Sequence, residues 1–189
     1  MGKKVGLTLQ DVVDVAAAIA DRDGLEAMTL RAVADQLGVK TPSLYNHVAG
    51  LSGLRRELAL HAASQLAAVV DGAATQADPA EVIRRTARDY RRFALEHPGL
   101  YQALLPAPRP GADDELYNAM AAPVATLAET LVAGGVDETQ TLHTIRTLRA
   151  VVHGFIDLET KDGFGMPEDI EVSFERALEV VIDGVMVSR

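Results

Sequence analysis

Residues 38–48, GVKTPSLYNHV, bring together side chains that could contact a nucleic acid. The candidates in this short stretch are Lys40, Thr41, Pro42, Ser43, Tyr45, Asn46 and His47. Hydroxyl and amide groups can meet base edges and phosphates, and the apolar parts of Thr41, Pro42 and Tyr45 can contact thymine methyl groups. Lys40, beside the N–H groups at the start of a helix, favours a phosphate. These residue types indicate recognition chemistry, provided that a helix presents them on one face.

Two helices separated by a tight turn are predicted to position these side chains. Thr29 can cap the first helix. Apolar residues then follow on one face of it: Leu30, Val33, Ala34 and Leu37. Gly38 can end this helix in the left-handed conformation. Thr41 can cap the second helix, with Pro42 at its first position, where a missing N–H costs nothing.

On a helical wheel of residues 41–48, Leu44 and Val48 point inward. The residues predicted to point outward are Pro42, Ser43, Tyr45 and Asn46, with Thr41 and His47 at the edges. This spacing is typical of a helix-turn-helix whose second helix can enter the major groove of DNA. A purely structural three-helix corner would have the same spacing, and some helix-turn-helix folds bind protein instead of DNA.

The rest of the chain is also predicted to be helical. Helical periodicity places further helices at residues 8–22, 51–70, 79–96, 98–105, 113–133, 137–161 and 168–187. Three prolines in residues 106–111 and two glycines in residues 161–167 predict loops. With no convincing strand, the expected class is all-α. We expect an N-terminal three-helix domain over residues 1–58 and a larger helical domain over residues 59–189.

Composition argues against several other classes of protein. The chain has 189 residues, 48% of them hydrophobic, and no cysteine, so we expect neither disorder nor a disulfide or thiolate zinc site. No apolar run reaches the roughly 18 residues of a membrane span, and no signal peptide is apparent, so we expect a cytoplasmic protein. HExxH, P-loop, GxGxxG and GxSxG motifs are absent. We therefore expect no metal site, no cofactor and no enzyme activity, and a helical enzyme is only a minor alternative.

The net charge of −9 is unevenly distributed along the chain. Residues 1–60 contain seven basic and seven acidic side chains, whereas residues 61–189 contain eleven and twenty. The acidic surplus therefore lies outside the candidate segment, which permits a polyanionic partner at the N-terminal end. Chance variation in surface charge would produce the same asymmetry.

The stretch MTLRAVADQLGVKTPSLYNHVAGLSGLRREL resembles the DNA-binding domain of TetR family transcriptional regulators. The resemblance covers about residues 8–58, and its most specific part is similar to the family pattern Gly-Val-x-x-x-x-Leu-Tyr-x-His-Phe. It implies DNA contacts from Thr29, Arg31, Lys40, Thr41, Pro42, Ser43, Tyr45 and His47. Two departures stand out. Gly50 and Leu51 replace a frequent Asn/Ser-Lys pair whose Lys contacts phosphate, and Val48 replaces the usual Phe.

The C-terminal part is similar to the WHG-type domain of the same family. In RAVVHGFIDLE, His153 and Gly154 match, whereas the expected Trp is absent. The resemblance implies that the last two helices form a four-helix interface with a second subunit. The candidate interface residues are Leu148, Val152, Phe155, Phe174, Leu178, Val181 and Val185. Alternatively, both faces of these helices are used inside one chain.

Large or polar residues of the middle helices could line a cavity for a small molecule. The candidates are Tyr90, Phe93, Tyr101, Tyr117, Met120, His143, Arg146 and His153. Residues of these types, taken singly, are more often ordinary core or surface residues than ligand contacts. Together, the motif and the resemblance predict a homodimeric, ligand-responsive repressor that binds a palindromic operator in double-stranded DNA. The main alternative is a helical protein-interaction module.

Overall fold

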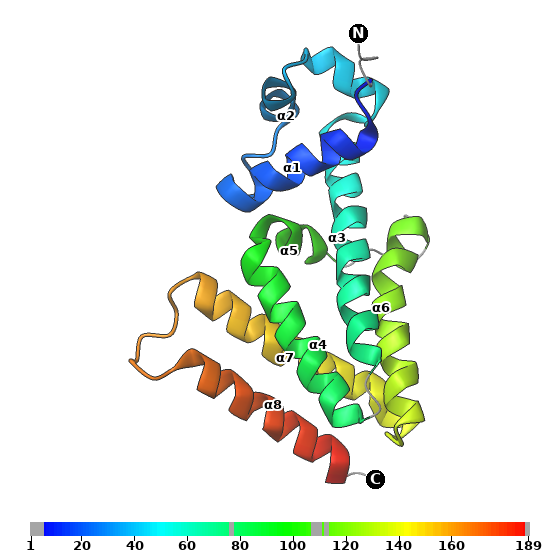
Figure 1. Ribbon diagram of the computed structural model, residues 1–189, viewed down its shortest axis with the longest axis vertical. Helices are drawn as coiled ribbons and strands as arrows, with labels where there is room; N and C mark the ends of the chain where they lie inside the picture. Colours follow the sequence, from blue (N-terminus) through cyan, green and yellow to red (C-terminus); the bar gives the residue numbers. More distant parts are fainter. Residues whose placement is uncertain (1–5, 76–77, 107–110, 112–113, 188–189) are drawn as a thin grey trace. The chain divides into compact units, whose positions relative to one another are not determined.

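The computed structural model describes residues 6–75, 78–106, 111 and 114–187. Over these residues the chain consists of helices and connecting loops without a strand, which confirms the all-α prediction (Figure 1). The elements are α1 (Leu9–Asp23), α2 (Leu30–Leu37), η1 (Thr41–Asn46), α3 (Gly50–Ala74), α4 (Pro79–Glu96), α5 (Pro98–Leu104), α6 (Asp114–Ala133), α7 (Glu138–Thr160) and α8 (Ile170–Val187).

Local capping interactions fix the ends of the first helices. The Thr8 hydroxyl accepts a hydrogen bond from the Asp11 N–H at 3.1 Å, and the Asp11 carboxylate accepts one from the Thr8 N–H at 2.8 Å. This reciprocal capping box starts α1. The Thr29 hydroxyl caps α2 in the same way by accepting the N–H of Ala32 at 3.1 Å. Gly38 ends α2 with a φ of 67°, a left-handed conformation that glycine adopts without strain.

Two elements differ from the sequence-based prediction. Residues 41–46 form the short 3₁₀ helix η1 in place of a helix over residues 41–48, and its first bond runs from the Ser43 N–H to the Lys40 carbonyl at 2.8 Å. The predicted Thr41 cap is wrong, because Thr41 is the first residue of η1, Lys40 precedes it, and no side chain among the described residues caps this helix. Pro42 has no N–H to donate, and the tighter 3₁₀ pattern is common in such short segments. Helix α3 continues to Ala74, beyond its predicted end at residue 70. The loop predicted at residues 106–111 lies mostly outside the described residues.

The chain forms two compact units, of which the first comprises Met1–Ser64 and Glu96–Tyr117. In this unit α1 packs on α2 and on α5, and α2 packs on η1. Its most deeply buried side chains include Val12, Met28, Val33, Leu44, Leu54 and Leu58. The predicted domain boundary after residue 58 stays a prediction, because packing within the folded chain does not test independent folding.

The second unit comprises Gln65–Leu95 and Asn118–Arg189. In this unit α7 packs against α8. Its most deeply buried side chains include Ile83, Leu131, Ile156, Phe174 and Leu178. The turn after α7 is closed by the Gly163 N–H, which donates to the Leu158 carbonyl at 2.6 Å. Among the described residues, no helix is both long and apolar enough to cross a membrane.

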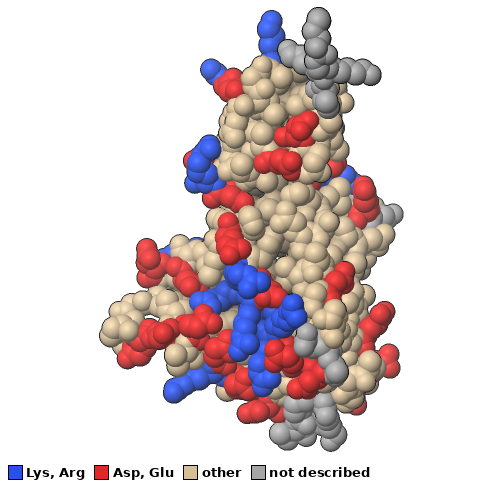
Figure 2. All heavy atoms as spheres, in the orientation of Figure 1, with Lys and Arg blue, Asp and Glu red and all other residues tan. Residues whose placement is uncertain are grey.

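Arginines of α4 pair with glutamates of α8 at successive helical turns. Arg84 donates through Nε and Nη2 to Glu179 at 2.7 and 3.1 Å, and Arg88 donates to Glu175 at 2.6 Å through both nitrogens. Figure 2 shows basic side chains gathered over α4 and bordered by acidic ones. Such two-point pairs fix geometry as well as charge, so they hold α4 and α8 in one register.

Arg91 extends this series and is its least exposed member. It donates to Glu159 of α7 at 2.9 and 3.0 Å and to Glu171 of α8 at 2.5 Å. Its guanidinium also lies over the ring of Phe174, 4.7 Å from the centroid. We call Arg84, Arg88 and Arg91 the arginine ladder, which joins α4 to both C-terminal helices.

Candidate nucleic-acid interface

Two buried apolar side chains set the orientation of η1. Leu44 is fully buried and Val48 is 5% exposed, so both point into the core of the first unit as predicted. The intervening Tyr45 is 61% exposed. The opposite orientations of neighbouring residues show that η1 lies on the surface of the unit and leaves one face open.

The predicted DNA-contact residues fall into two groups by exposure. The exposed ones are Thr29, Arg31, Lys40, Pro42, Tyr45 and Asn46. The half-buried ones are Thr41, Ser43 and His47. Ser43 was predicted to point outward and is instead partly covered. All nine residues lie between the start of α2 and the turn before α3, in one compact unit.

The cations near η1 differ in how far neighbouring acids neutralise them. Arg55 is bound to Glu26 at 3.0 Å. Arg31 and Asp35, both strongly exposed, approach only to 3.7 Å. Within the described residues Lys40 forms no ion pair. Exposed surface pairs contribute little energy, so Arg31 and Lys40 are both available to a phosphate.

Helix α3 begins at Gly50, which has a φ of 72°. Its N–H donates to the Val48 carbonyl at 2.9 Å, so the chain turns sharply between η1 and α3. A left-handed residue is needed for this turn, and glycine meets the requirement without strain. Where the family often has Asn or Ser, Gly50 therefore serves the backbone turn. Where the family often has Lys, Leu51 supplies no positive charge.

The structure brings two of the predicted ligand residues together in the second unit. The Tyr90 hydroxyl of α4 lies 3.1 Å from Nε2 of His153 on α7, and the two rings meet edge to face with centroids 5.4 Å apart. Arg149 Nε also donates to His153 Nε2 at 3.1 Å. Burial, with a smaller contribution from the Arg149 charge, lowers the pKa of His153 to about 4. The imidazole is therefore neutral near pH 7.

The other predicted ligand residues do not form one cluster. Tyr101 is buried and Tyr117 partly exposed, and both belong to the first compact unit. The remaining four lie in the second unit: Phe93 is buried, Met120 is half-buried, and His143 and Arg146 are exposed.

Sequence reasoning missed one polar group near Tyr90. Thr86 lies one helical turn earlier on α4, is 6% exposed, and its hydroxyl has no hydrogen-bond partner among the described residues. Buried polar groups are nearly always satisfied, so this hydroxyl is an exception that needs a reason. A threonine among the apolar residues of a helix face is the only sequence signal, and it is a common one.

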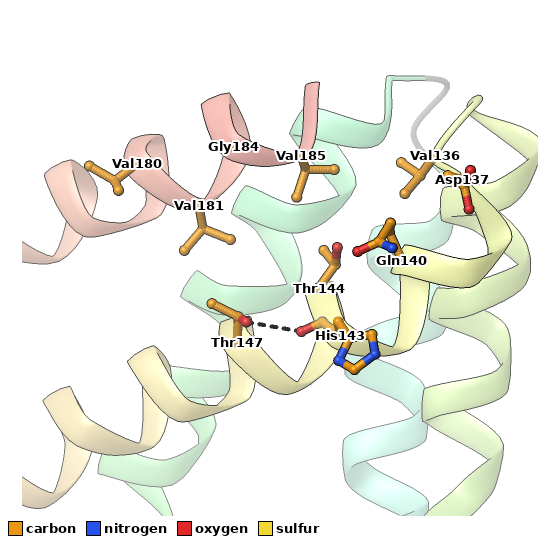
Figure 3. A pocket seen from close by; sticks show the side chains of 10 residues that line it. All are labelled: Val136, Asp137, Gln140, His143, Thr144, Thr147, Val180, Val181, Gly184 and Val185. Atoms are coloured by element: carbon orange, nitrogen blue, oxygen red, sulfur yellow. Dashed lines mark hydrogen bonds between the residues drawn. The ribbon is translucent and has the colours of Figure 1, made fainter. Parts of the chain in front are cut away.

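A groove of about 320 Å³ lies between α7 and α8 (Figure 3). Polar side chains of α7 form one wall: Gln140, His143, Thr144 and Thr147. Valines of α8 form the other: Val180, Val181 and Val185, with Gly184 beside them. The Thr147 hydroxyl donates to the His143 carbonyl at 2.9 Å and is thereby held within its own helix.

The predicted subunit-interface residues have different surroundings. Leu148, Val152, Phe174 and Leu178 are almost fully buried in the single chain. Phe155 is half-buried and packs its ring near Phe164 and Phe174, whereas Val181 and Val185 remain partly exposed at the groove. The inward faces of α7 and α8 are therefore used inside this chain. Among the residues of these two helices whose exposure the structure describes, the exposed large apolar ones are Leu142, Leu158, Val172 and Val180.

An all-helical chain whose N-terminal helix-turn-helix exposes a polar, partly aromatic face defines a class of protein, the helix-turn-helix DNA-binding proteins. Comparison with known proteins narrows this class. Residues 83–181 match the family model described as "Tetracyclin repressor-like, C-terminal domain". The chain is 31% identical over 189 residues to the uncharacterized HTH-type transcriptional regulator YobS of Bacillus subtilis, covering 100% of this chain and 97% of the relative.

Solved structures share the fold. A protein of unknown function from Rhodococcus sp. RHA1 superposes with a TM-score of 0.81 at 20% identity, covering 98% of both chains. A possible TetR family transcriptional regulator from Streptomyces coelicolor A3(2) gives a TM-score of 0.73 at 17% identity, covering 96% of this chain and 100% of the other. The chain belongs to the TetR family of transcriptional regulators. It is thus a DNA-binding regulator and not an enzyme.

Proposed function

We propose that this regulator is a repressor that binds a palindromic operator as a homodimer and is released by a small-molecule effector. The observation that supports DNA recognition most strongly is the exposed face of η1, where Tyr45 projects beside Pro42 and Asn46 above the buried Leu44. A repressor of this kind acts on chromosomal DNA, so its proposed location is the cytoplasm.

The proposed division of labour on DNA follows from side-chain chemistry. Tyr45 and Asn46 reach base edges, and Pro42 with the Thr41 methyl contacts thymine methyl groups. Cations and hydroxyls around this face contact phosphates and set the register. The proposed phosphate-contact residues are Thr29, Arg31, Lys40, Ser43 and His47.

The proposed subunit interface uses the exposed apolar residues of α7 and α8. Val180 is 73% exposed and stands at the rim of the groove lined by Val181 and Val185. In a two-fold interface each surface meets its own copy, so Val180 of one subunit can enter the groove of the other. The polar wall with His143 and Thr147 would then be covered as well. The partial exposure of Val181 and Val185 supports this arrangement.

The proposed effector site lies in the second unit around Thr86, Tyr90 and His153. The buried Thr86 hydroxyl could be satisfied by an effector. Tyr90 and neutral His153 carry no charge and can donate or accept hydrogen bonds, so these groups favour an effector with hydrogen-bonding groups. Phe93 and Met120 are proposed as apolar contacts. The other four predicted ligand residues stay predictions that this group does not support. Tyr101 and Tyr117 belong to the first unit, and His143 and Arg146 are exposed.

Selection from random double-stranded DNA, followed by electrophoretic mobility shift, tests the proposed function. We expect enrichment of a palindrome with half-sites about one helical turn, roughly 34 Å, apart. The purified protein should form dimers at the concentrations of the assay. An intact dimer that enriches no sequence would refute the operator model and favour the protein-interaction module.

A further inference from the structure

Helix α5 is capped by a residue from a different helix. Oδ1 of Asp21, near the end of α1, accepts the N–H of Gly99 at 2.8 Å and that of Leu100 at 3.1 Å. Oδ2 of the same carboxylate lies 2.9 Å from Nδ1 of His97. The first N–H groups of a helix lack partners within it and are usually satisfied by a side chain just before the helix. Here the acceptor is supplied across the unit.

Close backbone packing reinforces this cap. A Cβ atom on Gly99 would lie 2.5 Å from both the Cβ and the carbonyl oxygen of Ala20, so only glycine permits this approach of α5 to α1. Beyond the cap, the side chains of Leu100, Tyr101 and Leu104 are buried. Polar capping, backbone contact and apolar burial therefore all fix α5 on α1.

The segment Glu96–Tyr117, which includes α5, also contacts α3 through a residue near its other end. Arg56 of α3 donates to Glu115 at 2.5 Å, near the start of α6. Along the chain, the segment Glu96–Tyr117 connects α4 and α6, which continue into the second unit. Within the first unit it therefore contacts two helices of the DNA-binding region, α1 through Asp21 and α3 through Arg56.

Helix α1 in turn supports the recognition element. Val12, Ala16 and Ile19 on its inner face are buried in the same core as Val33 and Leu44. A shift of α1 would therefore change the position of η1, because a close-packed core transmits displacement from one helix to the next.

We propose that Asp21 is a positioning residue for operator binding. By capping α5 it fixes α1 to the segment Glu96–Tyr117, so that an effector which displaces this segment also displaces α1. The inference rests on the proposed function and adds to it a second route between the units besides the continuous helix α3. Without the cap, α1 and η1 occupy a wider range of positions and lose affinity for DNA.

Three variants of the full-length dimer test this role against the selected operator. Asp21→Ala removes both capping bonds, whereas Asp21→Asn keeps a carbonyl oxygen that can accept them. Asp14→Ala is the matched control, since Asp14 is an exposed carboxylate on the same helix that contacts only Gln10 among its described polar partners. Fluorescence anisotropy gives operator affinity, and amide hydrogen exchange at Gly99 and Leu100 reports the cap directly.

We expect Asp21→Ala to expose both amides to exchange and to weaken operator binding about three- to thirtyfold, the range that loss of a helix cap represents. Asp21→Asn should restore most of the affinity, and Asp14→Ala should bind at least as well as wild type. The direction is informative, because removing a negative charge alone strengthens binding to DNA. The proposal would be overturned if Asp21→Ala bound the operator with the same affinity as Asp14→Ala. It would also be overturned if Asp21→Asn bound the operator as weakly as Asp21→Ala.

Gly99→Ala covers the case in which Asp21→Ala fails to fold. It leaves the carboxylate in place and forces the two backbones apart, so operator affinity should again fall. Unchanged affinity in folded Gly99→Ala also overturns the proposal. If the wild-type dimer selects no operator, the proposed function itself fails. If the wild-type dimer selects an operator and no Asp21 or Gly99 variant changes the affinity for it, only the proposed role of Asp21 is refuted.

Discussion

Neighbouring residues of η1 separate recognition from folding. Tyr45 is 61% exposed and Leu44 is fully buried, although they are adjacent in the chain. We expect Tyr45→Ala to leave the free energy of unfolding unchanged and to weaken operator binding by about 1–3 kcal/mol, the loss of one good groove contact. We expect Leu44→Ala to destabilise the fold by about 2–5 kcal/mol. Urea unfolding and mobility shift of both variants measure the two effects, and equal operator affinity for Tyr45→Ala and wild type would remove Tyr45 from the interface.

His153 gives the second unit a predictable response to acid. Burial lowers its pKa from 6.5 to about 4, so between these values the unfolded chain binds a proton that the folded chain does not. The contribution of His153 to stability is therefore fully present above pH 6.5 and is lost as the pH falls towards 4.

Substitution of His153 tests this assignment. We expect His153→Gln to lose less stability than wild type between pH 7 and pH 5, as measured by urea unfolding at both values. His143→Gln is the control, because His143 is an exposed histidine on the same helix. If the stability of wild type and of His153→Gln depends on pH in the same way, the half-buried imidazole does not titrate as expected.

At the scale of elements, the arginine ladder sets the register between α4 and α8. The hydrogen bond from Arg88 lowers the pKa of Glu175, so the pair contributes above the ordinary glutamate range near 4.5 and is lost as the pH falls through the lowered pKa. Arg88 is partly exposed, which limits the expected coupling to about 0.5–1 kcal/mol. A double-mutant cycle of Arg88→Ala and Glu175→Ala should show this coupling at pH 7, and the coupling should decrease as acid protonates Glu175. Arg92→Ala, which removes an exposed arginine of α4 outside the ladder, should not couple to Glu175→Ala.

Elements whose ends depend on nearby residues could be predicted from the sequence. Thr8, Thr29 and Gly38 act as caps where the pattern placed them, because each capping bond spans at most a few positions along the chain. The length of α3 was underestimated, because Gly72 is a local stop signal that the helix passes through before it ends at Ala74.

Contacts between helices that are far apart in the chain could not be predicted from the sequence. Tyr90 and His153 were both named as candidates, yet only packing of α4 on α7 shows that they meet. The cap of α5 by Asp21 is even less predictable from the sequence, because nothing near residue 21 indicates a partner at Gly99. Contacts of this kind depend on the three-dimensional register of helices, which hydrophobic periodicity does not specify.

At the scale of the whole molecule, operator binding and dimerisation should be lost together. Val180 is 73% exposed in the single chain, so Val180→Asp should leave each subunit folded. A carboxylate at position 180 would lose its hydration in the two-fold interface, which is strongly unfavourable. We expect a monomer by analytical ultracentrifugation. Phe174→Asp is the contrasting variant, because Phe174 is fully buried and its replacement should unfold the chain.

The monomeric variant makes the two-fold operator model testable. One recognition element reaches a single half-site, so Val180→Asp should lose most of its affinity for the full palindrome. Because fewer phosphates are then neutralised, the slope of log affinity against log salt concentration should also become shallower. Titration of wild type and variant against the full operator and a half-site at several salt concentrations measures both effects. A monomer that binds the full operator as tightly as wild type, with the same salt slope, would rule out recognition by paired subunits.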